Sequence, residues 1–88
     1  MKTSDKFILK TIDDESMLIP VNHDYMSVQQ IINLNESSLC IYQMIKEGLD
    51  EDQIVNKMLS IYDVKEDVLR ADVKRIINQF IELGVIDE

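Results

Sequence analysis

The hydrophobic pattern of the chain changes its period near Asn35, and this change restricts the possible folds more than any other feature of the sequence. Before Asn35, apolar residues occur in short runs typical of β-strands, whereas after it they recur at helical spacing, as in segments 54–62 and 69–80. The chain has 88 residues and 45% hydrophobic content, which suffice for one small core. We therefore expect a single α+β domain, in which a three-stranded antiparallel sheet is followed by three helices in a winged helix-turn-helix-like arrangement.

The first part of the chain predicts a hairpin and a third, separate strand. Residues 7–12 and 17–19 have strand patterns, and residues 13–16 between them are typical of a turn. A loop is expected over residues 21–28. Residues 30–34 form the predicted third strand, which is short, uncharged and free of proline. Because this strand comes last in its sheet, we expect one of its edges to be unpaired.

The first predicted helix covers residues 36–47, with Asn35 as its N-cap and Gly48 at its end. Its candidates for burial are apolar residues at helical spacing: Leu39, Ile41, Tyr42 and Ile45.

Capping-box spacing marks the starts of the other two helices. Residues 50–53 fit the pattern and open a helix that is expected to run to about Tyr62. Residues 63–66 fit it too, although the third helix could begin a residue or two later. This helix is predicted to end before Gly84.

The charge distribution argues against nucleic acid and membrane partners. The formal net charge is −8, which repels phosphate backbones and anionic membrane surfaces. The short link between the second and third helices is nevertheless compatible with a DNA-reading module, so a winged-helix transcriptional or protein-interaction module is the alternative function. The third helix mixes cations with acids: Lys65, Arg70, Lys74 and Arg75 accompany Glu66, Asp67, Asp72 and Glu82. We therefore expect no nucleic acid partner.

Candidate catalytic groups are few. His23 with Asp24 lacks the further ligands of a metal site, and Cys40 is expected to be a buried small hydrophobe without an activating partner. We predict no enzymatic activity, no metal and no cofactor. A lone cysteine, the absence of a long apolar run and a start that lacks a signal-peptide core favour the cytoplasm.

Several segments resemble the PqqD-like family. They are residues 30–37, Ile41-Tyr42, residues 62–64, Asp72-Val73 and residues 84–86. The resemblance covers the chain from about Phe7 to Ile86 and rests mainly on apolar positions. The chain has Tyr42 where family members commonly have a bulky aromatic residue in the first helix, and Gln29 where a glycine often precedes the third strand. Neither departure threatens the fold.

The resemblance implies a non-catalytic peptide chaperone. Members of the family recognise leaders of ribosomally made precursor peptides, so the implied partners are a precursor leader peptide and a modifying enzyme of radical, cyclase or protease type. The leader would add as a strand beside the third strand and lie against the third helix. The candidate contacts are Gln29, Gln30, Ile31, Ile32, Asn33, Leu34, Arg70, Asp72, Val73, Lys74, Arg75, Ile76, Ile77 and Gln79.

The sequence leaves open which side of the third helix faces the leader. Helical geometry places Leu69, Val73, Ile76 and Phe80 on one stripe, which is expected to be core. One side of the stripe carries Arg70, Lys74, Ile77 and Ile81, and the other carries Val68, Asp72, Arg75 and Gln79. Helical angles favour the first side, whereas the resemblance favours the second through Asp72. The unpaired edge could also join two copies, so both a monomer and an edge-paired homodimer are compatible with the sequence.

Overall fold

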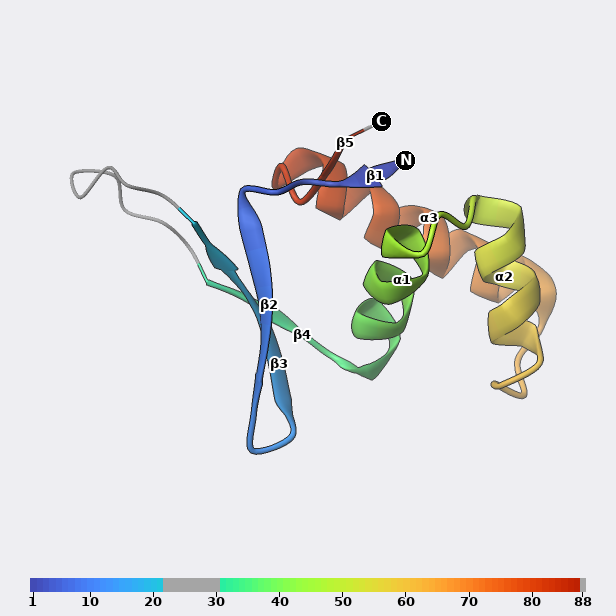
Figure 1. Ribbon diagram of the computed structural model, residues 1–88. Helices are drawn as coiled ribbons and strands as arrows, with labels where there is room; N and C mark the ends of the chain where they lie inside the picture. The colour runs from blue at the N-terminus through green and yellow to red at the C-terminus, as the bar shows by residue number, and fades with distance from the viewer. Residues whose placement is uncertain (22–30, 88) are drawn as a thin grey trace.

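The computed structural model describes residues 1–21 and 31–87. Apart from Val21, the predicted loop 21–28 lies outside the described residues. In chain order the elements are β1 (Lys2–Thr3), β2 (Phe7–Ile12), β3 (Glu15–Pro20), β4 (Ile32–Leu34), α1 (Glu36–Lys46), α2 (Glu51–Leu59), α3 (Glu66–Glu82) and β5 (Ile86–Asp87). The antiparallel sheet β2-β3-β4 precedes the three helices, which confirms the predicted fold class (Figure 1).

The β2–β3 hairpin turns at two residues, Asp13 and Asp14, whose φ angles are 50° and 66°. Ile12 lies opposite Glu15, so the turn is shorter than the predicted turn 13–16. Two consecutive left-handed residues match the twist of the flanking strands, and aspartate tolerates this conformation better than most residues. The tight turn lets β3 begin earlier than the predicted strand 17–19.

Strand β4 forms one edge of the sheet, with Ile32 opposite Leu18 of β3. It is shorter than the predicted strand 30–34, because Ile31 precedes it and Gln30 lies outside the described residues. Within the part of the chain that the structure describes, the other edge of β4 is unpaired, as predicted.

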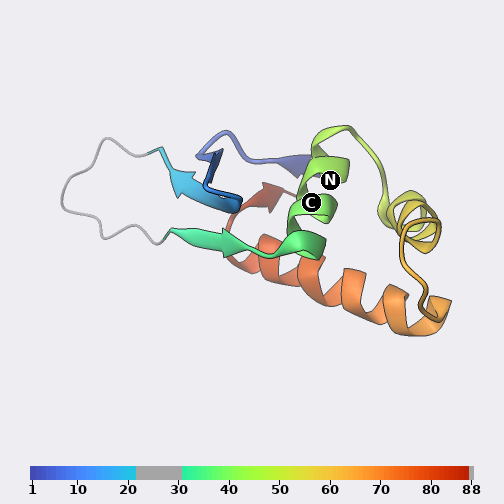
Figure 2. The same cartoon turned by 90° about the horizontal axis from the view of Figure 1, so that it is seen from below.

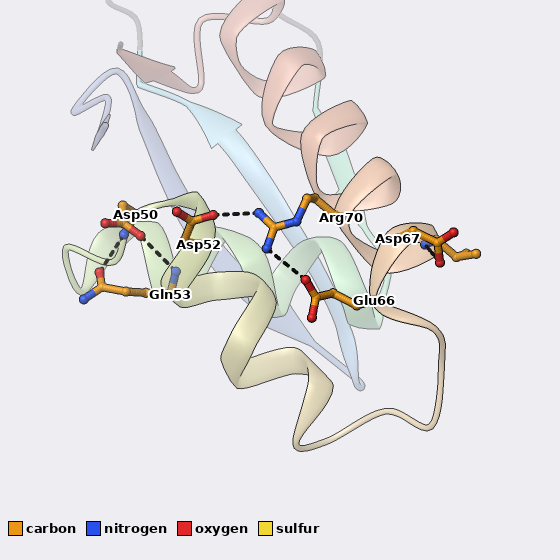
Figure 3. Close-up of polar contacts among 7 residues, drawn as sticks. Asp50, Asp52, Gln53, Glu66, Asp67 and Arg70 are labelled. Carbon is orange, nitrogen blue, oxygen red and sulfur yellow. Dashed lines mark hydrogen bonds and ion pairs between the residues drawn. The ribbon is translucent and has the colours of Figure 1, made fainter.

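The predicted caps of α1 and α2 are present. The side-chain oxygen of Asn35 accepts the N–H of Ser38 at 2.8 Å. Asp50 and Gln53 exchange two hydrogen bonds of 2.9 Å, which completes the capping box (Figure 3). Gly48, with a φ of 97°, follows α1 in the left-handed conformation that commonly ends helices.

Helix α2 ends at Leu59, three residues before the predicted end at Tyr62. Ser60 terminates it, because its hydroxyl donates to the carbonyl of Lys57 at 2.6 Å. The chain continues in one further turn, in which the N–H of Tyr62 donates to the carbonyl of Met58 at 2.8 Å. Tyr62 thus still packs against the core, although it is no longer helical.

Helix α3 begins at Glu66, two residues later than a cap at Asp63 would give, as the prediction allowed. Its N-cap is Lys65, which makes no side-chain capping bond. The Glu66 carboxylate contacts Arg70 at 3.4 Å instead of reaching back to Asp63 (Figure 3). Gly84, with a φ of 76°, follows the helix as predicted.

The core lies among the three helices and the inner face of the sheet. The buried residues of α3 are Leu69, Val73, Ile76, Ile77 and Phe80. The predicted stripe is therefore confirmed, but Ile77, predicted beside it, is only 5% exposed. Helix α3 packs against both α1 and α2, so a wider face is covered than one narrow stripe. The rings of Tyr42 and Phe80 meet edge to face, with centroids 6.2 Å apart. None of the described helices has the length and apolar content to cross a membrane.

Two short strands missed by the sequence analysis join the ends of the chain. In β1 and β5, Lys2 lies opposite Asp87 and Thr3 opposite Ile86. The N–H of Ser4 donates to the carbonyl of Val85 at 2.8 Å and extends this pairing. Figure 1 shows both ends at the top of the molecule, opposite the β2–β3 turn. This arrangement places the chain ends away from the turn side of the sheet.

Candidate functional site

A hollow of about 640 Å³ lies between β4 and α3. Its sheet side is formed by β4 and the β2–β3 turn, and the start of α1 closes one part of it. Its helix side is formed by one row of α3 residues, Arg75, Ile76, Gln79 and Phe80, and by Leu83 directly after the helix. Figure 2 shows β4 and α3 running alongside each other. The free edge of β4 therefore belongs to the wall of an open hollow.

A second hollow, of about 260 Å³, continues the first along α3. The two share Ser37, Arg75 and Ile76, so we treat them together as one groove. The lining of the second hollow is mainly apolar: Ile41, Met58, Tyr62, Val64, Val68, Leu69, Val73 and Ile76, with Ser37, Asp72 and Arg75. Val64 and Val68 are about half exposed, at 46% and 52%. The groove thus offers apolar side chains that the fold itself does not cover.

The predicted candidate residues fall into two groups, those that line the groove and those that do not. Those that line the groove are Ile32, Asn33, Leu34, Asp72, Val73, Arg75, Ile76 and Gln79. They come from β4 and from the side of α3 that carries Asp72, which is the side favoured by the resemblance.

The other predicted residues of α3 lie outside the groove. Arg70 faces α2, where it contacts Asp52 at 2.6 Å, and it also contacts Glu66 of its own helix at 3.4 Å (Figure 3). Ile77 is buried in the core, and Lys74 lines a separate shallow hollow. On the strand side, Ile31 is exposed and precedes β4, while Gln29 and Gln30 lie outside the described residues.

Several groove residues were absent from the predicted site. They are Asp14, Glu15 and Ser16 of the β2–β3 hairpin, Asn35, Glu36, Ser37 and Ser38 at the start of α1, Phe80 of α3 and Leu83 after it, and Ile41, Met58, Tyr62, Val64, Val68 and Leu69 in the second hollow. Asp14, Glu15 and Ser16 approach β4 only in the folded molecule, whereas residues 35–38 directly follow β4 in the chain and Phe80 belongs to α3 itself. Val68 could have been predicted from the sequence, because a valine beside the core stripe of a helix is an apolar residue without an evident place in the core.

The sheet side of the groove is acidic. Asp14, Glu15 and Glu36 line it, and all three residues are exposed. On the helix side, Arg75 lies 3.8 Å from the carboxylate of Asp72. The groove therefore combines an acidic wall, an apolar hollow and one arginine that already has a partner.

Two titratable groups near the groove are held in their neutral forms. Burial, reinforced by the neighbouring Glu36 carboxylate, raises the pKa of Tyr62. The same two effects raise the pKa of the Cys40 thiol, although Lys57 opposes them. Cys40 is half-buried and packs against the core, and a raised pKa disfavours the thiolate that a nucleophile requires.

The predicted His23–Asp24 pair lies outside the described residues. Within residues 1–21 and 31–87, no three side chains of His, Cys, Asp or Glu are grouped closely enough to hold a metal ion. The groove chemistry is thus that of a binding surface made of backbone, apolar side chains and carboxylates.

Comparison with known proteins gave a family and a fold. The family model described as "Coenzyme PQQ synthesis protein D (PqqD)" matches residues 13–86. Among solved structures, the chain is similar to TbiB1 in complex with the TbiA(beta) leader peptide, with 21% sequence identity and a TM-score of 0.83. That match covers 99% of this chain and 95% of the other. No curated protein sequence matches the chain.

Proposed function

Because the chain belongs to the PqqD family, we propose that it is a non-catalytic peptide chaperone that binds the leader of a ribosomally made precursor peptide. It would present the precursor to a separate modifying enzyme of radical, cyclase or protease type. One observation carries the proposal: the free edge of β4 lies in the wall of a groove whose opposite wall is α3. The similarity to TbiB1, seen with a leader peptide, supports the same kind of ligand.

The length of the groove fits a short extended peptide. Its α3 wall runs from Val68 to Leu83, which spans about 22 Å at the helical rise of about 1.5 Å per residue. About seven extended residues cover this distance at about 3.3 Å each. A leader strand of this length would pair with β4 and then continue beside α3 into the apolar hollow.

Energetics indicates why the apolar hollow matters. Ordering about seven residues costs roughly 7–14 kcal/mol of backbone entropy, whereas each ladder hydrogen bond contributes only about 0.5–1.5 kcal/mol. The short strand β4, Ile32–Leu34, offers few such bonds. Apolar side chains of the leader, each contributing about 1.5–3 kcal/mol on burial, must supply much of the remainder. The hollow beside Val64 and Val68 is suited to receive one of them.

The DNA-reading alternative has less support from the charges of α3. Of its cations, Arg70 is engaged by Asp52 and Glu66, and Arg75 lies near Asp72. A DNA reader needs such cations free to contact phosphates. The free edge could instead pair with a second copy of the chain, but that dimer would occupy the strand that a leader needs.

The test introduces proline singly at Ile31, Ile32 and Asn33, because proline removes one backbone donor and hinders an incoming strand. Alanine at the same positions is the matched control, since it keeps the N–H group. The ligand is a fluorescein-labelled synthetic precursor leader, and fluorescence anisotropy measures its affinity.

Circular dichroism and thermal melting identify the variants that remain folded. At least one folded proline variant should bind the leader about tenfold more weakly than its alanine counterpart, a loss of about 1.4 kcal/mol. If every folded proline variant binds as tightly as the wild type, strand addition at β4 is wrong.

A further inference from the structure

The acidic wall of the groove is assembled from two distant parts of the chain. Asp14 comes from the β2–β3 turn, Glu15 is the first residue of β3, and Glu36 opens α1. The pairing of Ser16 with Leu34 brings the turn beside the start of that helix. Ion pairs among the described residues involve Arg70 and Arg75, and none involves these three carboxylates. Their negative charge therefore faces the groove without a neutralising side chain from the described chain.

The acidic wall also adjoins the apolar hollow. Ser37, the residue after Glu36, lines both hollows of the groove. Glu36 also lies close enough to Tyr62, in the apolar lining, to raise its pKa together with burial. An occupant of the groove consequently meets carboxylates and an apolar hollow next to each other.

The carboxylates of the acidic wall do not form a metal site among the described residues. No three acidic, histidine or cysteine side chains of the described residues gather as a metal site requires. Exposed carboxylates along a groove instead create a local negative potential, which favours the long, mobile side chains of lysine and arginine.

From this geometry we propose that the groove selects leaders in which a lysine or arginine, placed against Asp14, Glu15 and Glu36, is close in sequence to a bulky apolar residue that fills the second hollow. The inference rests on the proposed function and specifies the chemistry of the leader. The cationic residue improves selectivity and association rate, and the apolar residue supplies most of the affinity.

The test uses a display library of random 12-residue peptides, selected on the immobilised full-length chain. Peptides recovered by the wild type should be enriched in lysine or arginine near a large apolar residue. The double variant Glu15→Gln with Glu36→Gln should lose the basic enrichment and keep the apolar one. The matched control is Asp5→Asn with Glu47→Gln, which changes the net charge equally at exposed residues outside both hollows. It should keep both enrichments.

Individual peptides from the selection give the magnitude. Each carboxylate removed from the groove should weaken the binding of an enriched basic peptide about threefold, and added salt should reduce this difference. A selection that shows no basic enrichment, or the same loss in the control variant, overturns the inference.

A proline variant at β4 separates this outcome from failure of the proposed function. Peptides that lose binding on proline substitution but show no basic preference refute only the charge selectivity. If no peptide is enriched, or if the enriched peptides bind the folded proline variants undiminished, the proposed function fails as well.

Discussion

Replacement of Asn35 by alanine should lower the stability of the fold by an amount that the structure allows us to estimate. The Asn35 side-chain oxygen accepts the N–H of Ser38 at 2.8 Å and the hydroxyl of Ser37 at 3.1 Å. Its backbone is extended, with φ at −79° and ψ at 178°, so alanine adopts this conformation without strain. The substitution therefore removes the cap of α1 and little else.

Loss of such a cap costs about 1 kcal/mol. With an unfolding entropy of about 2.1 cal/mol/K per residue, a chain of 88 residues loses about 5 °C in melting temperature per kcal/mol. We expect Asn35→Ala to melt about 5 °C below the wild type by circular dichroism, with the urea m-value unchanged.

Asn35→Asp is the matched control, because it keeps an acceptor oxygen and adds a negative charge at the helix N-terminus. It should melt at or above the wild-type temperature. A melting temperature of Asn35→Ala within about 1 °C of the wild type, or an equal loss in Asn35→Asp, would refute the cap as the source of the stability.

Two further predictions concern the two arginines of α3 and the two tyrosines Tyr42 and Tyr62, of which Tyr42 is buried and Tyr62 is partly buried. Arg70→Ala should lower the melting temperature, because it breaks the contact with Asp52 that ties α3 to α2 and the contact with Glu66 within α3, and should leave leader affinity unchanged. Arg75→Ala should instead weaken binding with little effect on melting. The opposite pattern would place the leader on the Arg70 side. Burial raises the pKa of Tyr42 and of Tyr62, so their stabilising contribution is complete below the ordinary tyrosine value of about 10 and is lost as the pH rises through the raised values. Urea unfolding should give a smaller free energy of unfolding at about pH 10.5 than at about pH 8. Tyr42→Phe should reduce this difference between the two pH values. If the difference is as large in Tyr42→Phe as in the wild type, Tyr42 is not its source.

Signals confined to a few neighbouring residues made much of the fold predictable. The helix starts could be predicted at Asn35 and at the pair Asp50 and Gln53, because these side chains form hydrogen bonds with backbone N–H groups only three residues away. Gly48 and Gly84 mark helix ends for a similarly local reason, since each adopts a positive φ. Such signals do not depend on how the elements pack.

The parts that escaped prediction depend on tertiary packing. Both sides of α3 carry arginine and apolar residues, and helical angles favoured the Arg70 side, whereas the groove is lined by Arg75 and not by Arg70. The difference comes from tertiary packing, because Asp52 of α2 engages Arg70, while Arg75 on the other side of α3 shares a hollow with β4. Ile77 is likewise buried because α1 and α2 both pack against α3 and together cover a wide face of the helix. The candidate contacts themselves stay predictions until the variants are measured.

The pairing of β1 with β5 has a kinetic consequence. It closes a loop that contains almost the whole chain, and two-residue strands contribute too few hydrogen bonds to offset that closure entropy by themselves. The β1–β5 pairing should therefore form only after the helices have packed together, late in folding. Once formed, it holds Val85 and Ile86, which are 0% and 2% exposed. Hydrogen exchange at the Ser4 amide, bonded to the Val85 carbonyl, should accordingly report opening of the entire domain instead of the local fraying usual near a chain end.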